Sequence, residues 1–359
     1  MNKNRLFLDI HAIQTLPPSN INRDDTGSPK TAMYGGVRRA RVSSQSWKRA
    51  MREYFNNNGE DGNIGVRTLE IVRYVGDKIK NLDSSVSDEE AMEMANEVFK
   101  KAGITTTKDF KAKALFFLGE IQANLLAKAA IDKINDKKKL QQIINDNPAI
   151  DIALFGRMVA DDPSLNEDAS SQVAHAISTH AVQTEFDFFT AVDDLSPEDN
   201  AGAGMLGTVE FNSSTLYRYA NIAVHELNKQ LKDKEATIHA VKLFVEAFSN
   251  SLPTGKVNTF ANQTIPQAVI VTLRNDRPIS LATAFEEPIK SSDGHVDKSI
   301  QKLSQEFKRV EKFVNKPLWI LYVTFDEVEA LKEIGEGHDS LRNLLNILSE
   351  KLSKAIQGE

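Results

Sequence analysis

Residues 35–52 read GGVRRARVSSQSWKRAMR, which predicts a short basic strand followed by an amphipathic helix. Ser43 or Ser44 is a suitable N-cap for a helix from about Gln45 to Asn56, because a serine hydroxyl accepts a hydrogen bond from a first-turn amide. The apolar residues of this helix share one face, and they are Trp47, Ala50, Met51, Tyr54 and Phe55. Hydrogen-bond donors share the opposite face, and they are Gln45, Lys48, Arg49 and Arg52. We therefore expect a helix that is held by its aromatic residues and presents its donors to a ligand.

The same stretch concentrates positive charge on a chain whose formal net charge is −6. Residues 26–52 contain no Asp or Glu but seven cations, which are Lys30, Arg38, Arg39, Arg41, Lys48, Arg49 and Arg52. Removing these from the 44 Lys and Arg residues leaves 37 cations against 50 acids, a net charge of −13 for the rest of the chain. A basic segment on an acidic chain indicates local binding of a polyanion, although a solvated run that lacks acids gives the same pattern.

The contact expected at this segment is with a sugar-phosphate backbone. Arg and Lys neutralise phosphates, and a helix N-terminus supplies directional amide donors. The aromatic sheet motif of RNA-recognition domains is incomplete at residues 34–37 (YGGV), so stacking of bases on a sheet is not expected. The pattern favours binding of a single strand independently of its sequence.

Several classes of protein are excluded by composition. The chain has no cysteine, hence no disulfides, thiolate nucleophiles or thiolate metal ligands. Asp9 interrupts what would be the apolar part of a signal peptide. The most apolar long stretch, residues 112–131, carries Lys113, Glu120 and Lys128 and is therefore no membrane span. We expect a soluble cytoplasmic protein that does not enter a membrane.

The order of elements along the chain predicts an α+β fold. Residues 5–15 alternate as an opening strand, which we expect Pro17-Pro18 to end. Residues 62–170 read as almost wholly helical, in segments such as 88–101, 109–131 and 136–145. Strand patterns follow from about residue 185 and recur at 268–273 and 318–325, with helices at about 236–250, 299–314 and 327–355. This order suggests a sheet core with one large helical insertion and one hairpin insertion.

Three motifs that could carry other chemistry have ordinary explanations. The run GAGMLG at 202–207 matches a dinucleotide fingerprint in letters but enters a strand rather than a helix, so we interpret it as a hairpin tip. His175 and His180 are five residues apart, off the spacing of helical zinc pairs, and are interpreted as ordinary core or network histidines. Asp24-Asp25 forms an acidic pair in a loop, which is usually a solvated turn.

The chain resembles the CasC family, which forms the repeated backbone subunit of the type I-E CRISPR surveillance complex, Cascade. The stretches that carry the resemblance occur in order over the first 225 residues. They are NRDD (22–25), GGVRRARVSSQSWKRAMR (35–52), DIALFGRM (151–158), AHAISTH (174–180), DFFTAVDDL (187–195), LGTVEF (206–211) and YRYANI (217–222). The thumb tip SPEDNAGAGM (196–205) departs from the family pattern.

The resemblance implies an α+β, hand-shaped subunit. Its palm, a modified RNA-recognition (ferredoxin-like) fold, would comprise 1–61 and 172–359, with helical fingers at 62–171 and a β-hairpin thumb at 182–213. Family members bind the guide RNA (crRNA), stack side by side along it and present it for pairing with target DNA, and we therefore expect a non-catalytic RNA-binding scaffold. The implied partners are crRNA, other copies of the chain, the large, small, CasD and CasE subunits and target DNA, with no cofactor and no metal.

The resemblance also implies roles for individual residues. The residues placed against the guide backbone are Arg23, Lys30, Ser43, Ser44, Gln45, Lys48, Arg49 and Arg52. Met158 and Phe189 match positions that wedge against bases and displace one nucleotide at regular intervals, although both could instead be core residues. Lys137, Lys138 and Lys139 match a lysine-rich helix that attracts target DNA, although by sequence alone this run is a solvated face.

Two other functions stay open. Type III relatives of this backbone cut target RNA with an aspartate in a palm loop, and Asp24 or Asp25 lies in a comparable place, which makes a metal-dependent endoribonuclease the alternative. A metabolic enzyme would need a closed pocket with convergent titratable groups, which the sequence does not indicate.

Overall fold

The computed structural model describes residues 5–59, 63–192 and 202–358. The chain forms two compact units. The first comprises Met1–Met51, Val173–Asn221 and Phe244–Lys351, and the second Arg52–Gln172, Ile222–Leu243 and Leu352–Glu359. Strands and helices are both abundant, so the expected α+β class is confirmed. Among the helices in the described ranges, none has the length and apolar character needed to cross a membrane.

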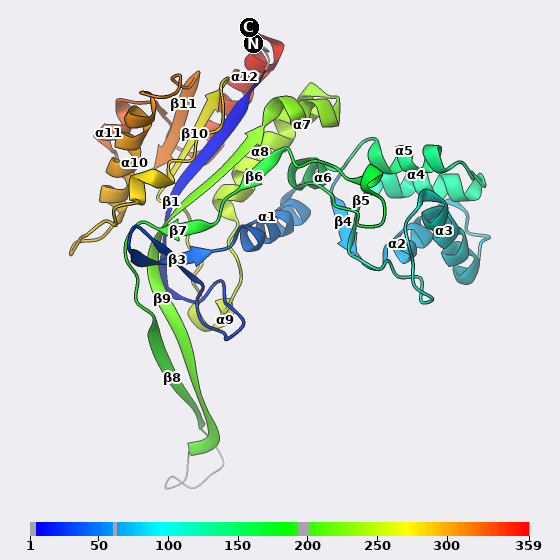
Figure 1. The fold of residues 1–359 in the computed structure, drawn as a ribbon, viewed down its shortest axis with the longest axis horizontal. Helices are drawn as coiled ribbons and strands as arrows, with labels where there is room; N and C mark the ends of the chain where they lie inside the picture. The colour runs from blue at the N-terminus through cyan, green and yellow to red at the C-terminus, as the bar shows by residue number, and fades with distance from the viewer. Residues whose placement is uncertain (1–4, 60–62, 193–201, 359) are drawn as a thin grey trace. The chain divides into compact units, whose positions relative to one another are not determined.

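In the described residues, ten strands form one sheet, in the order β12-β11-β10-β1-β9-β7-β3-β2, with β6 and β8 also paired to β9 (Figure 1). Their bounds are β1 Phe7–Ser19, β2 Thr31–Tyr34, β3 Val37–Val42, β6 Ser171–Val173, β7 Ala176–Ser178, β8 Glu185–Val192, β9 Gly202–Ala223, β10 Ala268–Arg274, β11 Trp319–Thr324 and β12 Glu336–Gly337. β10 lies antiparallel between β1 and β11, and all seven of its residues are buried. A strand buried on both faces needs packing partners on both sides, which accounts for its apolar sequence AVIVTLR.

The prediction that Pro17-Pro18 ends the first strand was wrong, since β1 continues to Ser19. Its pairing with β10 runs from Phe7↔Arg274 to Ile13↔Ala268. Both prolines lie beyond this ladder, where a missing backbone N–H costs no hydrogen bond to β10.

One face of the sheet is covered by the helix α10 (Val296–Val310) and the 3₁₀ turn η3 (Ala282–Phe285). Ile13 and Ile270 from the sheet form a buried cluster with Phe285, Leu303 and Phe307. These aromatic and branched side chains are the core that holds the sheet in the first unit.

The remaining helices are α1 Ser44–Asn58, α2 Ile71–Leu82, α3 Asp88–Ala102, α4 Glu120–Ile131, α5 Lys137–Asn145, α6 Ile150–Phe155, α7 Val224–Leu231, α8 Lys234–Asn250, α9 Val257–Phe260, α11 Glu329–Lys332 and α12 Leu341–Gln357, with a 3₁₀ turn η1 at Pro163–Leu165. The single helix expected at 327–355 was wrong, because α11 and α12 are separated by β12. Gly335 lies so close to β11 that a Cβ there would be 2.7 Å from Cγ2 of Ile320. α11 has already ended at Lys332, and the close approach of the chain to β11 at residue 335 leaves no space for a side chain larger than that of glycine.

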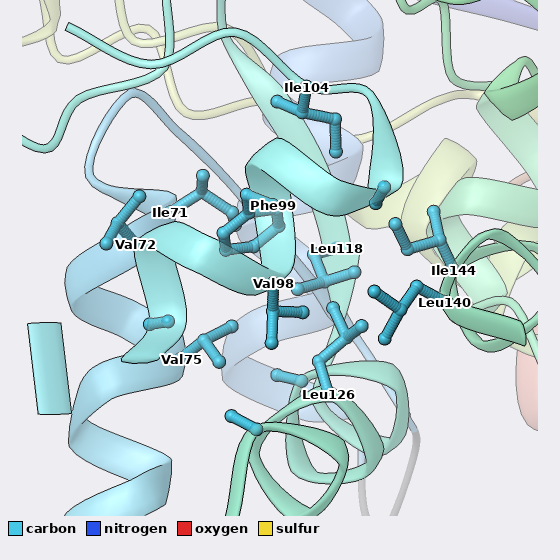
Figure 2. Packing of buried hydrophobic residues seen from close by; sticks show 14 of the residues in the cluster. Ile71, Val72, Val75, Val98, Phe99, Ile104, Leu118, Leu126, Leu140 and Ile144 are labelled. Carbon is cyan, nitrogen blue, oxygen red and sulfur yellow. The ribbon is translucent and has the colours of Figure 1, made fainter. Parts of the chain in front are cut away.

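The second unit has its own core, in which α2, α3, α4 and α5 pack together. Figure 2 shows Val98 and Phe99 of α3 beside Leu118, Leu126 and Leu140, and all five side chains are buried. The expected helix at 109–131 is shorter, because β5 (Phe116–Gly119) pairs with β4 (Gly65–Thr68) to form a separate two-stranded sheet. The partner strand is about 50 residues away in sequence, so local periodicity could not reveal it.

The expected hairpin is formed by β8 and the first half of β9, which run side by side beyond the rest of the sheet (Figure 1). The pairing extends from Glu185↔Phe211 through Phe189↔Gly207. Residues 193–201 of the predicted tip lie outside the described residues.

Candidate nucleic-acid interface

Ser43 organises the start of α1. Its hydroxyl accepts the N–H of Ser46 at 3.3 Å, and its carbonyl accepts the N–H of Trp47 at 3.2 Å. Its own N–H donates to Oδ1 of Asn22 at 2.8 Å, which ties the helix to the preceding loop. Ser43 is buried. The predicted cap is therefore present, and the hydroxyl of Ser43 is used inside the protein.

The loop at residues 22–30 is held by Asp24. Its carboxylate accepts hydrogen bonds from the hydroxyl and N–H of Thr26 at 2.7 and 3.0 Å and from the N–H of Ser28 at 3.0 Å. These bonds, that of the Thr26 hydroxyl first, lower the pKa of Asp24. Lys30 is half-buried and its N–H donates to the Asn22 carbonyl, whereas Arg23 is exposed. The loop thus has a fixed shape and presents the side chain of Arg23 to solvent.

Arg39 is a structural residue and not a part of the basic surface. It is fully buried and donates from Nη1 to Ser178 O at 2.9 Å and from Nη2 to Phe285 O at 2.8 Å. Gly35 and Gly36 form the β2–β3 turn, and Gly35 has φ +59°. A Cβ on Gly35 would lie 1.6 Å from the Glu286 carbonyl oxygen. Arg39, one of the seven cations counted in residues 26–52, is therefore not available to a ligand, because burial of its guanidinium could not be read from the sequence.

The first turns of α1 present the predicted donors to different extents. Gln45 and Arg49 are exposed, whereas Ser44 and Lys48 are half-buried. Burial lowers the pKa of Lys48. The N-terminal end of a helix attracts anions, so the exposed polar residues of this end are suited to a phosphate backbone.

Lys30, Arg41 and His175 gather beside the start of α1. The N–H of Ser44 donates to Nδ1 of His175 at 3.2 Å, and Nη1 of Arg41 lies 3.4 Å from the same nitrogen. Burial lowers the pKa of His175, and so do the charges of Arg41 and Lys30. The three basic side chains come from β3, from the loop before β2 and from the segment before β7.

Arg52 differs from the expectation of an exposed donor. Its Nε lies 3.4 Å from Oδ2 of Asp151, its guanidinium lies 4.5 Å from the ring centre of Phe117, and its side chain is 22% exposed. The Asp151 carboxylate is fully buried and also accepts the N–H of Gly65 at 2.8 Å. Burial raises the pKa of Asp151 to about 6 despite these contacts. Arg52 thus neutralises a buried acid in the second unit.

Met158 is not a core residue, since its side chain is 83% exposed. The preceding Arg157 is buried and donates from Nε to Leu165 O at 2.9 Å and from Nη1 to Ile144 O at 3.1 Å. Gly156, with φ +78°, makes the turn before it. The chain is therefore anchored at Arg157 so that the next side chain projects into solvent.

Phe189 is not a core residue either, because it is 40% exposed on the β8–β9 hairpin. It pairs across the hairpin with Gly207, and a Cβ on that glycine would lie 2.3 Å from the Phe189 ring. The ring therefore occupies the space that the glycine leaves open. Phe186 and Phe188 lie on the opposite face of β8 by strand alternation, and both are about two-thirds exposed.

The predicted lysine run forms the first turn of α5. Asp136 caps this helix by accepting the N–H of Lys138 at 2.8 Å, and all three lysines are exposed. Lys137 makes an ion pair with Asp162 at 3.2 Å. Hydrogen bonds from Ser164, together with Lys137, lower the pKa of Asp162 to about 2. In the described part of the chain, Lys138 and Lys139 make no ion pair, so their charges are available to a ligand.

The other predicted histidine, His180, is a network residue. Its Nδ1 lies 2.8 Å from Ala181 O, its Nε2 accepts the N–H of Thr215 at 3.0 Å, and its ring stacks on His295. Across residues 5–59, 63–192 and 202–358, no group of three or more His, Asp or Glu side chains is arranged to hold a metal ion.

The comparisons with known proteins agree with this geometry. A family model described as CT1975-like protein matches residues 8–347. The chain belongs to this family. A chain of a solved structure described as "CRISPR RNA-guided surveillance complex, pre-nicking" is 35% identical with a TM-score of 0.85, and the alignment covers 96% of this chain and 100% of that one. Another, described as "CRISPR RNA-guided surveillance complex", is 30% identical with a TM-score of 0.74, covering 96% of this chain and 99% of that one. No curated protein matches the chain.

The membership in the CasC family that the motifs predicted is thereby confirmed. Sequence reasoning missed Arg41 and His175 as members of the basic cluster. Arg41 was counted among the cations, but only the pairing of Arg41 with Ile177 places it beside His175. The run AHAISTH contained His175, yet its distance from residue 44 in sequence hid their contact.

Proposed function

We propose that this chain is the guide-RNA-binding backbone subunit of a type I-E CRISPR Cascade complex. The observation that carries the proposal is the 35% identity over 96% of the chain to a protein in an RNA-guided surveillance complex. The motifs at 35–52 and 187–195, which resemble the type I-E family, favour that subtype. The subunit holds crRNA, and target DNA pairs with the guide in antiviral defence.

The basic surface at the start of α1 supports RNA binding. It combines the exposed Arg23, Gln45 and Arg49 with the half-buried Lys30 and Lys48. Such donors contact phosphates without reading bases, so one surface can serve any guide sequence. Ser43 and Arg52 support the proposed RNA-binding surface through the fold. Ser43 caps α1, and Arg52 neutralises Asp151.

The proposed assembly contains several copies of the chain beside one another along the guide, in a helical filament. Met158 and Phe189 are the proposed wedges, and their exposure supports a role at bases rather than in the core. Stacking of a base on an aromatic ring contributes about 1–3 kcal/mol and is independent of sequence. The other proposed partners are the large, small, CasD and CasE subunits.

The lysine run at the start of α5 is proposed to attract target DNA, chiefly through Lys138 and Lys139, whose charges are not paired within the described residues. Replacing Lys138 and Lys139 by Gln should slow capture of double-stranded DNA by the assembled complex and leave its guide content unchanged. Lys137→Gln is the matched control, because the charge of Lys137 is already paired with Asp162. Equal effects of the two variants would contradict the proposal.

We propose that the chain is not an enzyme, with a metal-dependent endoribonuclease as the alternative. The use of the Asp24 carboxylate in three hydrogen bonds within its own loop supports a structural role for that residue. Asp25 is exposed and remains the candidate of the alternative. Incubating the assembled complex with complementary RNA, with and without Mg²⁺, separates the two, and cleavage that Asp25→Asn abolishes would establish the enzyme.

The main test is whether the purified protein carries RNA. Protein expressed with a CRISPR array and the other subunits should show an absorbance ratio typical of a nucleoprotein and release RNA of uniform length on a denaturing gel. RNA of random length would contradict a guide-specific assembly, and protein without RNA would contradict the proposal altogether.

A further inference from the structure

The protonation state of His175 follows from its contacts. Its Nδ1 accepts the N–H of Ser44 at 3.2 Å and lies 3.4 Å from Nη1 of Arg41. A nitrogen that accepts from a donor carries no proton of its own, so the imidazole is neutral and its proton is on Nε2. The ring is exposed, and among the described residues no group accepts the Nε2–H. His175 therefore presents one fixed hydrogen-bond donor to solvent.

The surroundings of this donor are positively charged. Arg41 is oriented by a bond of its Nε to Thr31 O at 3.4 Å, and Lys30 lies on the adjoining loop. Within the described ranges, neither Lys30 nor Arg41 is in an ion pair. The charged groups that face His175 are both cations, and burial, followed by the charges of Arg41 and Lys30, keeps the pKa of His175 below its usual value. An anion in contact with the three side chains would remove this electrostatic cost.

We infer that His175, Arg41 and Lys30 form a phosphate subsite of the RNA interface, in which the Nε2–H of His175 donates to a backbone oxygen of the guide. The inference rests on the proposed function and adds two residues to it. Arg41 and Lys30 supply charge, and His175 supplies direction, because its ring is fixed by the first amide of α1. The subsite binds a phosphate of any nucleotide.

A pH signature follows from this arrangement. The bound phosphate neutralises the field of Arg41 and Lys30 and itself favours the imidazolium, so RNA binding raises the pKa of His175. The complex then takes up protons, and RNA affinity rises as the pH falls from about 8 to 6. The gain in RNA affinity at low pH is limited, since a protonated Nδ1 of His175 can no longer accept the N–H of Ser44.

The test uses His175→Asn, in which the amide oxygen can replace Nδ1 as the acceptor for Ser44 while the outward Nε2–H is lost. RNA affinity of the full chain is measured with a synthetic guide at several salt concentrations and pH values. We expect an affinity about 5–10-fold lower at pH 7, a weaker pH dependence and an unchanged salt slope at pH 8, because a neutral donor releases no counterions. His239→Asn is the matched control, as His239 is exposed on α8.

Lys30→Gln and Arg41→Gln separate this inference from the proposed function. Each should reduce the slope of log affinity against log salt by about 0.7. If Lys30→Gln and Arg41→Gln reduce the salt slope but His175→Asn binds RNA with wild-type affinity, only the role of His175 is overturned. A loss of affinity in His175→Asn that comes with an equally large fall in the melting temperature of the RNA-free protein would also overturn it, in favour of a role in positioning α1. Wild-type protein that does not bind RNA would overturn the proposed function itself.

Discussion

The guanidinium of Arg52 lies beside the fully buried carboxylate of Asp151, so removing it should affect the fold before it affects any ligand. Replacing Arg52 by Ala leaves a buried charge with fewer partners, which costs up to about 3–5 kcal/mol at neutral pH. We expect a clear fall in the melting temperature of the RNA-free protein. The loss should shrink at lower pH, because the pKa of Asp151, already raised to about 6, rises further without Arg52 and protonation then removes the buried charge.

The double variant Arg52→Ala/Asp151→Asn is the control for this prediction. It should recover much of the lost stability, since the uncompensated charge is gone. A double variant that melts as low as Arg52→Ala would show that packing of Arg52 on Phe117, rather than charge, is what the second unit needs. RNA binding by Arg52→Ala alone is therefore ambiguous, whereas binding by the double variant reports on the guide contact.

Asp9 and His11 make opposite contributions to the pH dependence of the first unit. Burial raises the pKa of Asp9 to about 7, although the Tyr219 hydroxyl donates to it at 2.7 Å. Burial lowers the pKa of His11 to about 3. Between about pH 4 and 6.5 the native state holds a proton on Asp9 that the unfolded state has lost, so the Asp9 contribution to stability falls as pH rises. In the same range the unfolded state binds a proton at His11 that the native state lacks, so the His11 contribution rises with pH.

Asp9→Asn should remove the Asp9 contribution to the pH dependence of stability and leave that of His11. Relative to the wild type, its free energy of unfolding should rise with pH by about 1.4 kcal/mol per unit between pH 4 and 6.5. Denaturant unfolding at several pH values, monitored within the first unit, measures this slope. Parallel curves for the two proteins would mean that the Asp9 carboxyl titrates normally in the folded state.

At the scale of elements, the β8–β9 hairpin offers the sharpest test of the proposed base wedge. Phe189 lies over Gly207 and is 40% exposed, so Phe189→Ala leaves little cavity and should shift the melting temperature of the RNA-free protein by only a few degrees. In the assembled complex the same change should alter the chemical reactivity of guide bases at regular intervals. Phe188→Ala is the matched control, since Phe188 is the neighbouring phenylalanine on the opposite face. An identical reactivity pattern for both variants would contradict the wedge.

Elements whose partners are near in sequence could be predicted, and those with distant partners could not. The strand at 37–42 and the cap at Ser43 follow from local pattern and agree with the structure. β5 was missed because its sequence FFLG also suits a buried helix and its partner is β4. The end of β1 was misplaced because proline forbids only a ladder bond from its own nitrogen, and the ladder of β1 with β10 ends at Ile13, before both prolines.

The same distinction explains the site. Exposure of Gln45 and Arg49 follows from helical periodicity. Burial of Arg39 does not, because it depends on carbonyls at Ser178 and Phe285 that the chain brings from far away. Arg52 was placed on an exposed face for the same reason, since the helical pattern contains no information about Asp151.

For the whole molecule, the net charge is negative, whereas the proposed RNA-binding surface is positively charged. A chain with a formal net charge of −6 is repelled by a polyanion at long range, so binding must depend on contacts within about one Debye length of the basic surface. The affinity for RNA should therefore fall strongly with salt, as expected for phosphate contacts at the surface of α1.

The last prediction concerns the sequence dependence and the stoichiometry of RNA binding by the whole chain. If the contacts are to phosphates and to base faces, two RNAs of equal length and unrelated sequence should bind with affinities within a few-fold of each other. An RNA of twice the length should bind twice as many copies, because each copy covers a fixed number of nucleotides. Mass photometry of the full chain with these three RNAs gives both quantities. A single bound copy on every RNA, or a more than tenfold preference for one sequence, would contradict a backbone subunit and favour a protein that recognises one RNA site.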